Sequence, residues 1–152
     1  MRNLTLTALA AATFFSLGAA ATPAMAEKPA IYTPPLSKLA IEGYDPMSYF
    51  SGQPTKGDDK FSLTHKGVEY RFASAANLAR FKANPDAYLP QYGGYCAWAV
   101  SRGYTAKGDP AAWKLVGGKL YLNYDAKVQA RWAADIPGNI SKADKNWPQV
   151  LK

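Results

Sequence analysis

The chain of 152 residues has only one cysteine, Cys96, and one histidine, His65. One cysteine cannot form a disulfide within the chain, so the core must be held by packing. One histidine excludes a zinc site built from several histidines, and no glycine-rich phosphate loop follows an expected strand. No carboxylate pair is spaced for acid–base work, so the sequence favours a binding role over an enzyme. A Cys96–His65 dyad stays open, because such partners meet only in space.

The first 26 residues have the pattern of a secretory signal peptide. Arg2 supplies the positive end, an apolar run covers residues 4–21, and the segment closes with Ala24-Met25-Ala26. The run approaches the roughly 20 residues of a spanning helix, but it is rich in alanine and threonine and ends in a cleavage site. No cysteine near that site would carry a lipid. We therefore expect a periplasmic or secreted protein without a stable membrane anchor.

The formal net charge of +7 falls by one when Arg2 is removed. The basic residues are scattered along the chain, whereas a nucleic-acid surface would need a stripe of Lys and Arg with interleaved aromatic residues. We therefore expect no nucleic-acid partner. Weak attraction to anionic membrane surfaces or to acidic partners stays open.

Three segments are expected: the signal sequence at 1–26, a proline-rich arm at 27–37 and one domain at 38–152. All ten tyrosines and four tryptophans follow the cleavage site, which supplies large side chains for a core without disulfides. No internal repeat is recognised in this domain.

Alternating apolar residues predict two β-hairpins, over 61–72 with a turn at Lys66-Gly67 and over 113–124 with a turn at Gly117-Gly118. Short helices are expected after Asp45-Pro46 and after the YGGY segment, and a longer one from the Ser74 cap to Pro85. Asp109 and Asp125 are interpreted as helix caps. The helix after Asp125 is expected to end near Pro137-Gly138, and a last helix to follow Asn139. The predicted class is α+β, with a small antiparallel sheet built from the two hairpins and packed with several short helices.

Several motifs in one order resemble the YHS-domain family. They are GYDPMSYF, an aromatic hairpin running into a helix that ends at Asn84-Pro85, the YGGYCA loop and the LYLN strand. Members of that family are often described as candidate metal-binding modules, and shorter relatives are attached to copper-transporting pumps. The resemblance covers most of the expected mature chain and implies a YHS-like scaffold with a loose association with metals.

The sequence departs from this family at the presumed thiol ligands. Where the relatives have Phe-Cys-Ser-x-x-Cys, this chain has alanine at position 73 and asparagine at position 77. Met47 and Ser48 follow the Asp-Pro pair without a cysteine. The thiol-cluster site of the relatives is therefore not carried over to this chain.

Cys96 is the strongest candidate for chemistry. Two glycines and a short helix would put its sulfur near unpaired backbone N–H groups, which lower a thiol pKa and favour a metal ligand or a nucleophile. Cuprous ion prefers thiolate, thioether and imidazole, so the candidate copper ligands are Cys96, Met47 and His65. Three ordinary roles compete with this hypothesis: a small buried cysteine, a core methionine and a solvated turn histidine.

Glycines and tyrosines in two loops suggest a small-ligand pocket, because glycines open access to the backbone and tyrosines supply flat walls. A tyrosine-rich core whose glycines serve turns is the competing interpretation. The pocket residues would be Gly43, Tyr44, Asp45, Tyr92, Gly93, Gly94 and Tyr95.

The sequence thus favours a periplasmic binding module of the YHS type that binds a transition metal, preferably copper, through Cys96 and neighbouring loops. The alternative is a non-metal interaction or thiol-redox protein whose Cys96 is buried or reacts with a partner. The partners considered are a metal ion or small ligand and a periplasmic protein.

Overall fold

The computed structural model describes residues 26–152. The predicted signal sequence, apart from its last residue, lies outside the described residues. Within 26–152, no helix has both the length and the apolar character that crossing a membrane requires.

The first half of the domain holds a hairpin between short helices. Its elements are η1 (Ala40–Gly43), η2 (Pro46–Ser51), β1 (Asp58–His65), β2 (Val68–Phe72) and α1 (Ala75–Ala83). Asp45 caps η2 by accepting the Met47 N–H at 2.8 Å, and proline stands at the first helical position. Ser74 caps α1 by accepting the Asn77 N–H at 3.1 Å, as its sequence position predicts.

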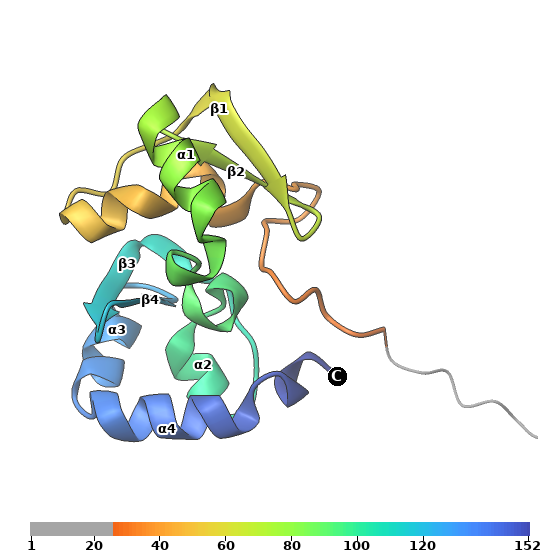
Figure 1. The fold of residues 1–152 in the computed structure, drawn as a ribbon. Coiled ribbons are helices and arrows are strands. Elements are labelled where there is room, and N and C mark those ends of the chain that lie inside the picture. Colours follow the sequence, from red (N-terminus) through yellow and green to blue (C-terminus); the bar gives the residue numbers. More distant parts are fainter. Residues whose placement is uncertain (1–25) are drawn as a thin grey trace, which may run out of the picture.

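The second half repeats this order and adds a C-terminal helix. Its elements are η3 (Pro85–Ala87), η4 (Gln91–Gly94), α2 (Ala97–Ser101), β3 (Asp109–Val116), β4 (Lys119–Asn123), α3 (Ala126–Ala133), α4 (Ile136–Asn146) and η5 (Gln149–Leu151). In Figure 1 the first half forms the upper lobe and the second half the lower lobe, with α4 lying along the bottom.

The α+β class and both hairpins are confirmed. Each hairpin forms its own two-stranded antiparallel sheet within the described residues, in the orders β1-β2 and β3-β4. Helix η2 of the first half contacts β3 of the second: the Tyr49 hydroxyl donates to the Pro110 carbonyl at 2.9 Å, and the Tyr49 ring meets Trp113 edge-on.

The two halves are structural repeats displaced by 51 residues, as from Asp58 to Asp109. The displacement holds for η1 and η4, for both hairpins, and for α1 and α3. It holds even for the irregularity in strand pairing: Asp58 pairs with Phe72 and Asp109 with Asn123, each followed by the same shift in register. The expectation of no internal repeat is therefore wrong. We call residues 39–84 repeat 1 and residues 90–135 repeat 2.

Some of the residues shared by the repeats stand where the backbone is unusual. Gly43 and Gly94 both have positive φ, and the residues two before them, Ile41 and Tyr92, are also left-handed, with φ of 50° and 55°. A bulky residue rarely adopts this conformation, so its presence at the same position in both repeats marks a common loop design. Identical pairs include Gly43/Gly94, Tyr44/Tyr95, Gly52/Gly103, Lys56/Lys107, Gly57/Gly108, Asp58/Asp109, Gly67/Gly118 and Tyr70/Tyr121.

Two predicted helix boundaries are wrong. The last helix begins at Ile136 rather than after Asn139, because Asp135 caps it by accepting the Gly138 N–H at 3.0 Å. Pro137 lies in the first turn, where a missing N–H breaks no helical hydrogen bond, so the Pro-Gly pair opens a helix instead of ending one. Asp109 caps no helix: it opens β3 and accepts the Ala111 N–H at 2.8 Å.

Strand β4 lies between two apolar cores. Leu120 and Leu122 point into a core made mainly by repeat 1, whereas Tyr121 joins a core made by repeat 2, α4 and η5. Successive residues of a strand face opposite sides, so one strand serves both cores. The arm crosses the junction of the two repeats, where the Tyr32 N–H donates to the Gly93 carbonyl at 2.9 Å (Figure 1).

Candidate functional site

Cys96 lies at the N-terminal end of α2 and is 1% exposed. Its Sγ is 3.7 Å from Oδ1 of Asn123, which also accepts the Trp98 N–H at 3.1 Å. An oxygen that only accepts favours sulfur that carries a proton, so Asn123 holds Cys96 as a thiol rather than a thiolate.

The expected low pKa of Cys96 is wrong. Burial raises the pKa of the thiol above its ordinary value of 9.0, and the N–H groups of Ala99, Tyr124 and Trp98 offset this only in part. The position of Cys96 at the start of a helix was predicted correctly. Burial nevertheless raises the thiol pKa by more than the N–H groups at the helix end lower it. At neutral pH the sulfur is therefore a poor nucleophile, and it must lose a proton before it can bind a soft metal.

The repeat relationship explains the surroundings of Cys96. Its counterpart in repeat 1 is Asp45, which is fully buried and accepts three hydrogen bonds. The donors are the Met47 N–H at 2.8 Å, the Ala73 N–H at 2.9 Å and the Asn77 side-chain amide at 2.7 Å. A buried carboxylate is tolerated when its oxygens are paired in this way. Asp45, predicted as a pocket residue, thus joins η2 to the β2–α1 junction.

The three predicted copper ligands have separate surroundings. Met47 is 4% exposed in the core of repeat 1. The imidazole of His65 packs edge-on against the rings of Tyr70 and Phe81, and its Nε2 is buried with no hydrogen-bond partner among residues 26–152. Cys96 contacts Asn123 in repeat 2. Within the described residues, no group of three or more His, Cys, Asp or Glu side chains is arranged to hold a metal ion.

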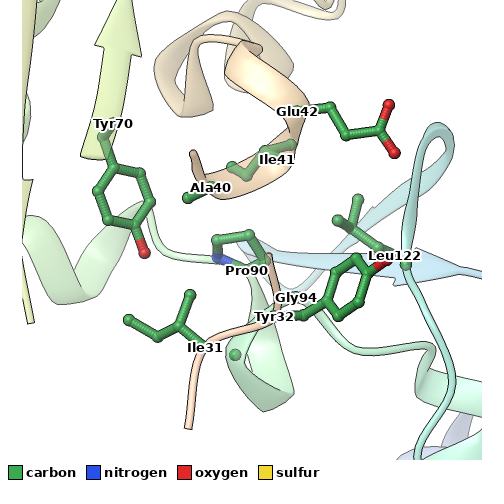
Figure 2. A pocket seen from close by; sticks show the side chains of 11 residues that line it. Ile31, Tyr32, Ala40, Ile41, Glu42, Tyr70, Pro90, Gly94 and Leu122 are labelled. Carbon is green, nitrogen blue, oxygen red and sulfur yellow. The ribbon is translucent and has the colours of Figure 1, made fainter. Parts of the chain in front are cut away.

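A small cavity lies at the junction of the repeats, and of the two predicted pocket loops only the one that holds Gly93 and Gly94 lines it (Figure 2). Ile41 and Glu42 approach from η1, and Gly93 and Gly94 from η4. Its volume is about 10 Å³, which is at the limit of one water molecule. This space is too small for a ligand. The predicted residues Gly43, Tyr44 and Tyr95 line neither this cavity nor the larger one described next.

The larger cavity, of about 280 Å³, adjoins the small one. We call it the seam cavity, because the arm, the turn of the first hairpin, the η3–η4 link and the end of α4 all contribute to it. It shares Ile31, Tyr70, Pro90 and Gly93 with the small cavity. Its remaining lining residues are Ala30, Lys66, Asp86, Leu89, Gln91, Tyr92 and Trp147.

Three aromatic side chains form much of the wall of the seam cavity. The Tyr92 hydroxyl is held by the Asp144 carboxylate at 2.8 Å, and the Tyr92 ring lies 5.9 Å from that of Trp147. Tyr70 differs, because no hydrogen-bond partner within residues 26–152 reaches its hydroxyl, and burial alone raises its pKa. In Figure 2 this hydroxyl points toward Ile31 and Pro90, two residues that line both cavities. It therefore offers an unused donor and acceptor there.

One ion pair lies among the lining residues. Lys66 Nζ is 3.2 Å from Asp86 Oδ1, and the two side chains are 57% and 80% exposed. An exposed pair of this kind contributes little to folding. The two charges are therefore free to meet a ligand.

Sequence reasoning found Tyr92 and Gly93 but missed Lys66, Tyr70, Asp86 and Trp147. These four come from three segments, the first hairpin, η3 and the end of α4, and nothing in their local patterns joins them. Lys66-Gly67 indicated only a turn, and Tyr70 only an inward strand position. The one usable signal was the repeat itself, because aligning the halves would have shown which loops meet at their junction.

No family model, curated protein or solved structure matches this chain. A function is therefore inferred from the geometry of residues 26–152.

Proposed function

We propose that this protein is an exported, non-catalytic binding module of the YHS type that holds a small ligand in the seam cavity. The observation that carries this proposal is the cavity of about 280 Å³ lined by Tyr70, Tyr92 and Trp147. Its volume lies just below the range for ligand sites, and its lining combines apolar and aromatic side chains with the polar side chains of Lys66, Asp86 and Gln91.

The absence of an activated group favours binding over catalysis at this site. Burial raises the pKa of both Tyr70 and Tyr92, so their hydroxyls stay protonated at neutral pH. Lys66 and Asp86 are paired with each other at 3.2 Å and are exposed, which suits them to hold a charged ligand. Within the described lining there is no cysteine, serine or histidine to act as nucleophile or base.

Copper binding at Cys96 is the second candidate function. It is favoured by the N–H groups of Ala99, Tyr124 and Trp98, which would stabilise a thiolate once the proton has left. It is opposed by burial and by the contact between Sγ and Asn123 Oδ1. Loading would require Asn123 to move and the thiol to ionise.

A substitution that fills the seam cavity tests the leading proposal. p-Cresol, a ring with one hydroxyl, should bind the wild-type protein with a dissociation constant on the order of 1 mM by ligand-observed NMR, a modest value for so few atoms. Leu89→Trp places a larger side chain in the lining and should weaken binding at least about tenfold. Leu115→Trp is the matched control, because Leu115 is also half-buried but does not line the cavity. Equal binding by all three proteins would overturn the proposal.

A further inference from the structure

We propose that the ligand of the seam cavity is a free aromatic α-amino acid in its zwitterionic form. This inference rests on the proposed function, and it adds the chemical class of the ligand. It is drawn from the charges, the walls and the size of the cavity.

Charge complementarity comes from Lys66 and Asp86. A ligand that is only an anion would bring its charge near Asp86 as well as Lys66, because their charged atoms are 3.2 Å apart. A ligand that is only a cation would bring its charge near Lys66 as well as Asp86. An α-amino acid carries both charges on one carbon atom, so its carboxylate can pair with Lys66 while its ammonium pairs with Asp86.

The walls select the side chain of that amino acid. Tyr92 and Trp147 present rings whose centroids are 5.9 Å apart at 59°, and Tyr70 supplies a third ring. Aromatic groups prefer edge-to-face and offset contacts of this kind, so a ligand ring gains more here than an aliphatic chain does. Ile31, Leu89 and Pro90 add aliphatic side chains to the lining.

The size of the seam cavity suits a ligand with one ring. Its volume of about 280 Å³ lies just below the range of pockets that hold drug-sized ligands, and one ring with an amino-acid group is smaller than such a ligand. The arm also limits the space, since Ala30 and Ile31 form part of the lining and Tyr32 is bonded to Gly93.

Four probes with related rings test how much each ligand charge contributes to affinity. They are L-phenylalanine, 2-phenylethylamine as the cation, 3-phenylpropionate as the anion and p-cresol as the neutral compound. By titration NMR at neutral pH, L-phenylalanine should bind at least about fivefold more tightly than each of the other three, a gain in the range of exposed ion pairs. Added salt should reduce this difference, because the two side chains are exposed.

Two substitutions test which charge of the ligand is recognised by Lys66 and which by Asp86. Lys66→Met should lower the affinity for L-phenylalanine to that for 2-phenylethylamine, and Asp86→Asn should lower it to that for 3-phenylpropionate. Glu69→Gln is the matched control, because Glu69 forms an ion pair with Arg71 at 2.7 Å but does not line the cavity. This control should bind L-phenylalanine as the wild type does.

The outcomes distinguish this inference from the proposed function. If p-cresol binds as tightly as L-phenylalanine, and Leu89→Trp blocks both, the zwitterion inference is overturned while the proposed function stands. If none of the four probes binds, both are overturned. A preference for L-phenylalanine that survives both Lys66→Met and Asp86→Asn also overturns the inference, because the charges are then recognised elsewhere.

Discussion

Cys96 occupies in repeat 2 the position that Asp45 occupies in repeat 1. The backbone is alike on both sides of the two residues: Tyr44 is bridged to Lys56 and Tyr95 to Lys107. In both repeats the backbone N–H two residues further on donates a hydrogen bond. The Met47 N–H donates to Asp45 itself, and the Trp98 N–H donates to Asn123. A carboxylate in one repeat and an uncharged thiol in the other thus support equivalent turns.

The pH dependence of stability should carry a contribution from Cys96. Its pKa is raised in the folded protein, so the unfolded chain loses its thiol proton first as the pH rises past 9.0. The unfolded state then binds fewer protons than the folded state, and the free energy of unfolding falls with pH, by up to about 1.4 kcal/mol per unit. The full contribution of Cys96 to stability is present below pH 9.0, and it is lost as the pH rises to the pKa of the thiol in the folded protein.

The control for this prediction is Cys96→Ala. The variant should be less stable at all pH values, but its free energy of unfolding should fall less steeply above 9.0. Tyrosines with raised pKa values act in the same direction in both proteins and cancel in the comparison. Parallel curves from urea titrations at several pH values would contradict the assignment.

Asp45→Asn should destabilise the protein by about 2–4 kcal/mol. The variant amide offers one acceptor oxygen where the carboxylate accepts from Met47, Ala73 and Asn77, so at least one buried donor loses its partner. Asp86→Asn is the matched control on an exposed side chain, and it should change stability by less than about 0.5 kcal/mol. Urea unfolding measures both, and similar values would show that Asp45 is not a structural hub.

The two tyrosines Tyr49 and Tyr70 should respond in opposite ways to removal of their hydroxyls. Tyr49→Phe loses a buried hydrogen bond to the Pro110 carbonyl and should cost about 1 kcal/mol. Tyr70→Phe removes a hydroxyl that has no partner within residues 26–152, so stability should stay equal or rise by up to about 1 kcal/mol. Binding of p-cresol should nevertheless weaken in Tyr70→Phe. A loss of stability as large as that of Tyr49→Phe would contradict a free Tyr70 hydroxyl.

Local patterns predicted the parts of this fold that depend on near neighbours. Alternation of apolar residues marked both hairpins, and the Ser74 and Asp125 caps marked the starts of α1 and α3. The repeat escaped notice because most equivalent positions differ, as Asp45 and Cys96 do. The pKa of Cys96 was missed because it depends on burial and on Asn123, which is distant in sequence. The seam cavity was missed for the same reason, since its lining joins four separate segments.

Copper uptake by Cys96→Ser separates the two candidate functions. If Cys96 is a neutral buried thiol, wild type and variant should take up equal and small amounts of cuprous ion under reducing conditions. The thermal midpoint of the variant should fall, in line with a cost of about 1 kcal/mol for a hydroxyl beside Asn123. One copper per wild-type chain, lost in Cys96→Ser with no change in stability, would instead establish the metal site.

Contacts between bound p-cresol and the protein test the seam cavity most directly. Intermolecular nuclear Overhauser effects, measured on the wild-type protein with p-cresol in excess, report which side chains lie beside the ligand. The proposed function predicts contacts from the p-cresol ring and methyl group to Ile31, Leu89 and Trp147, all of which line the cavity. Contacts confined to side chains outside that lining, such as Trp98 and Tyr124 near Cys96, would contradict it.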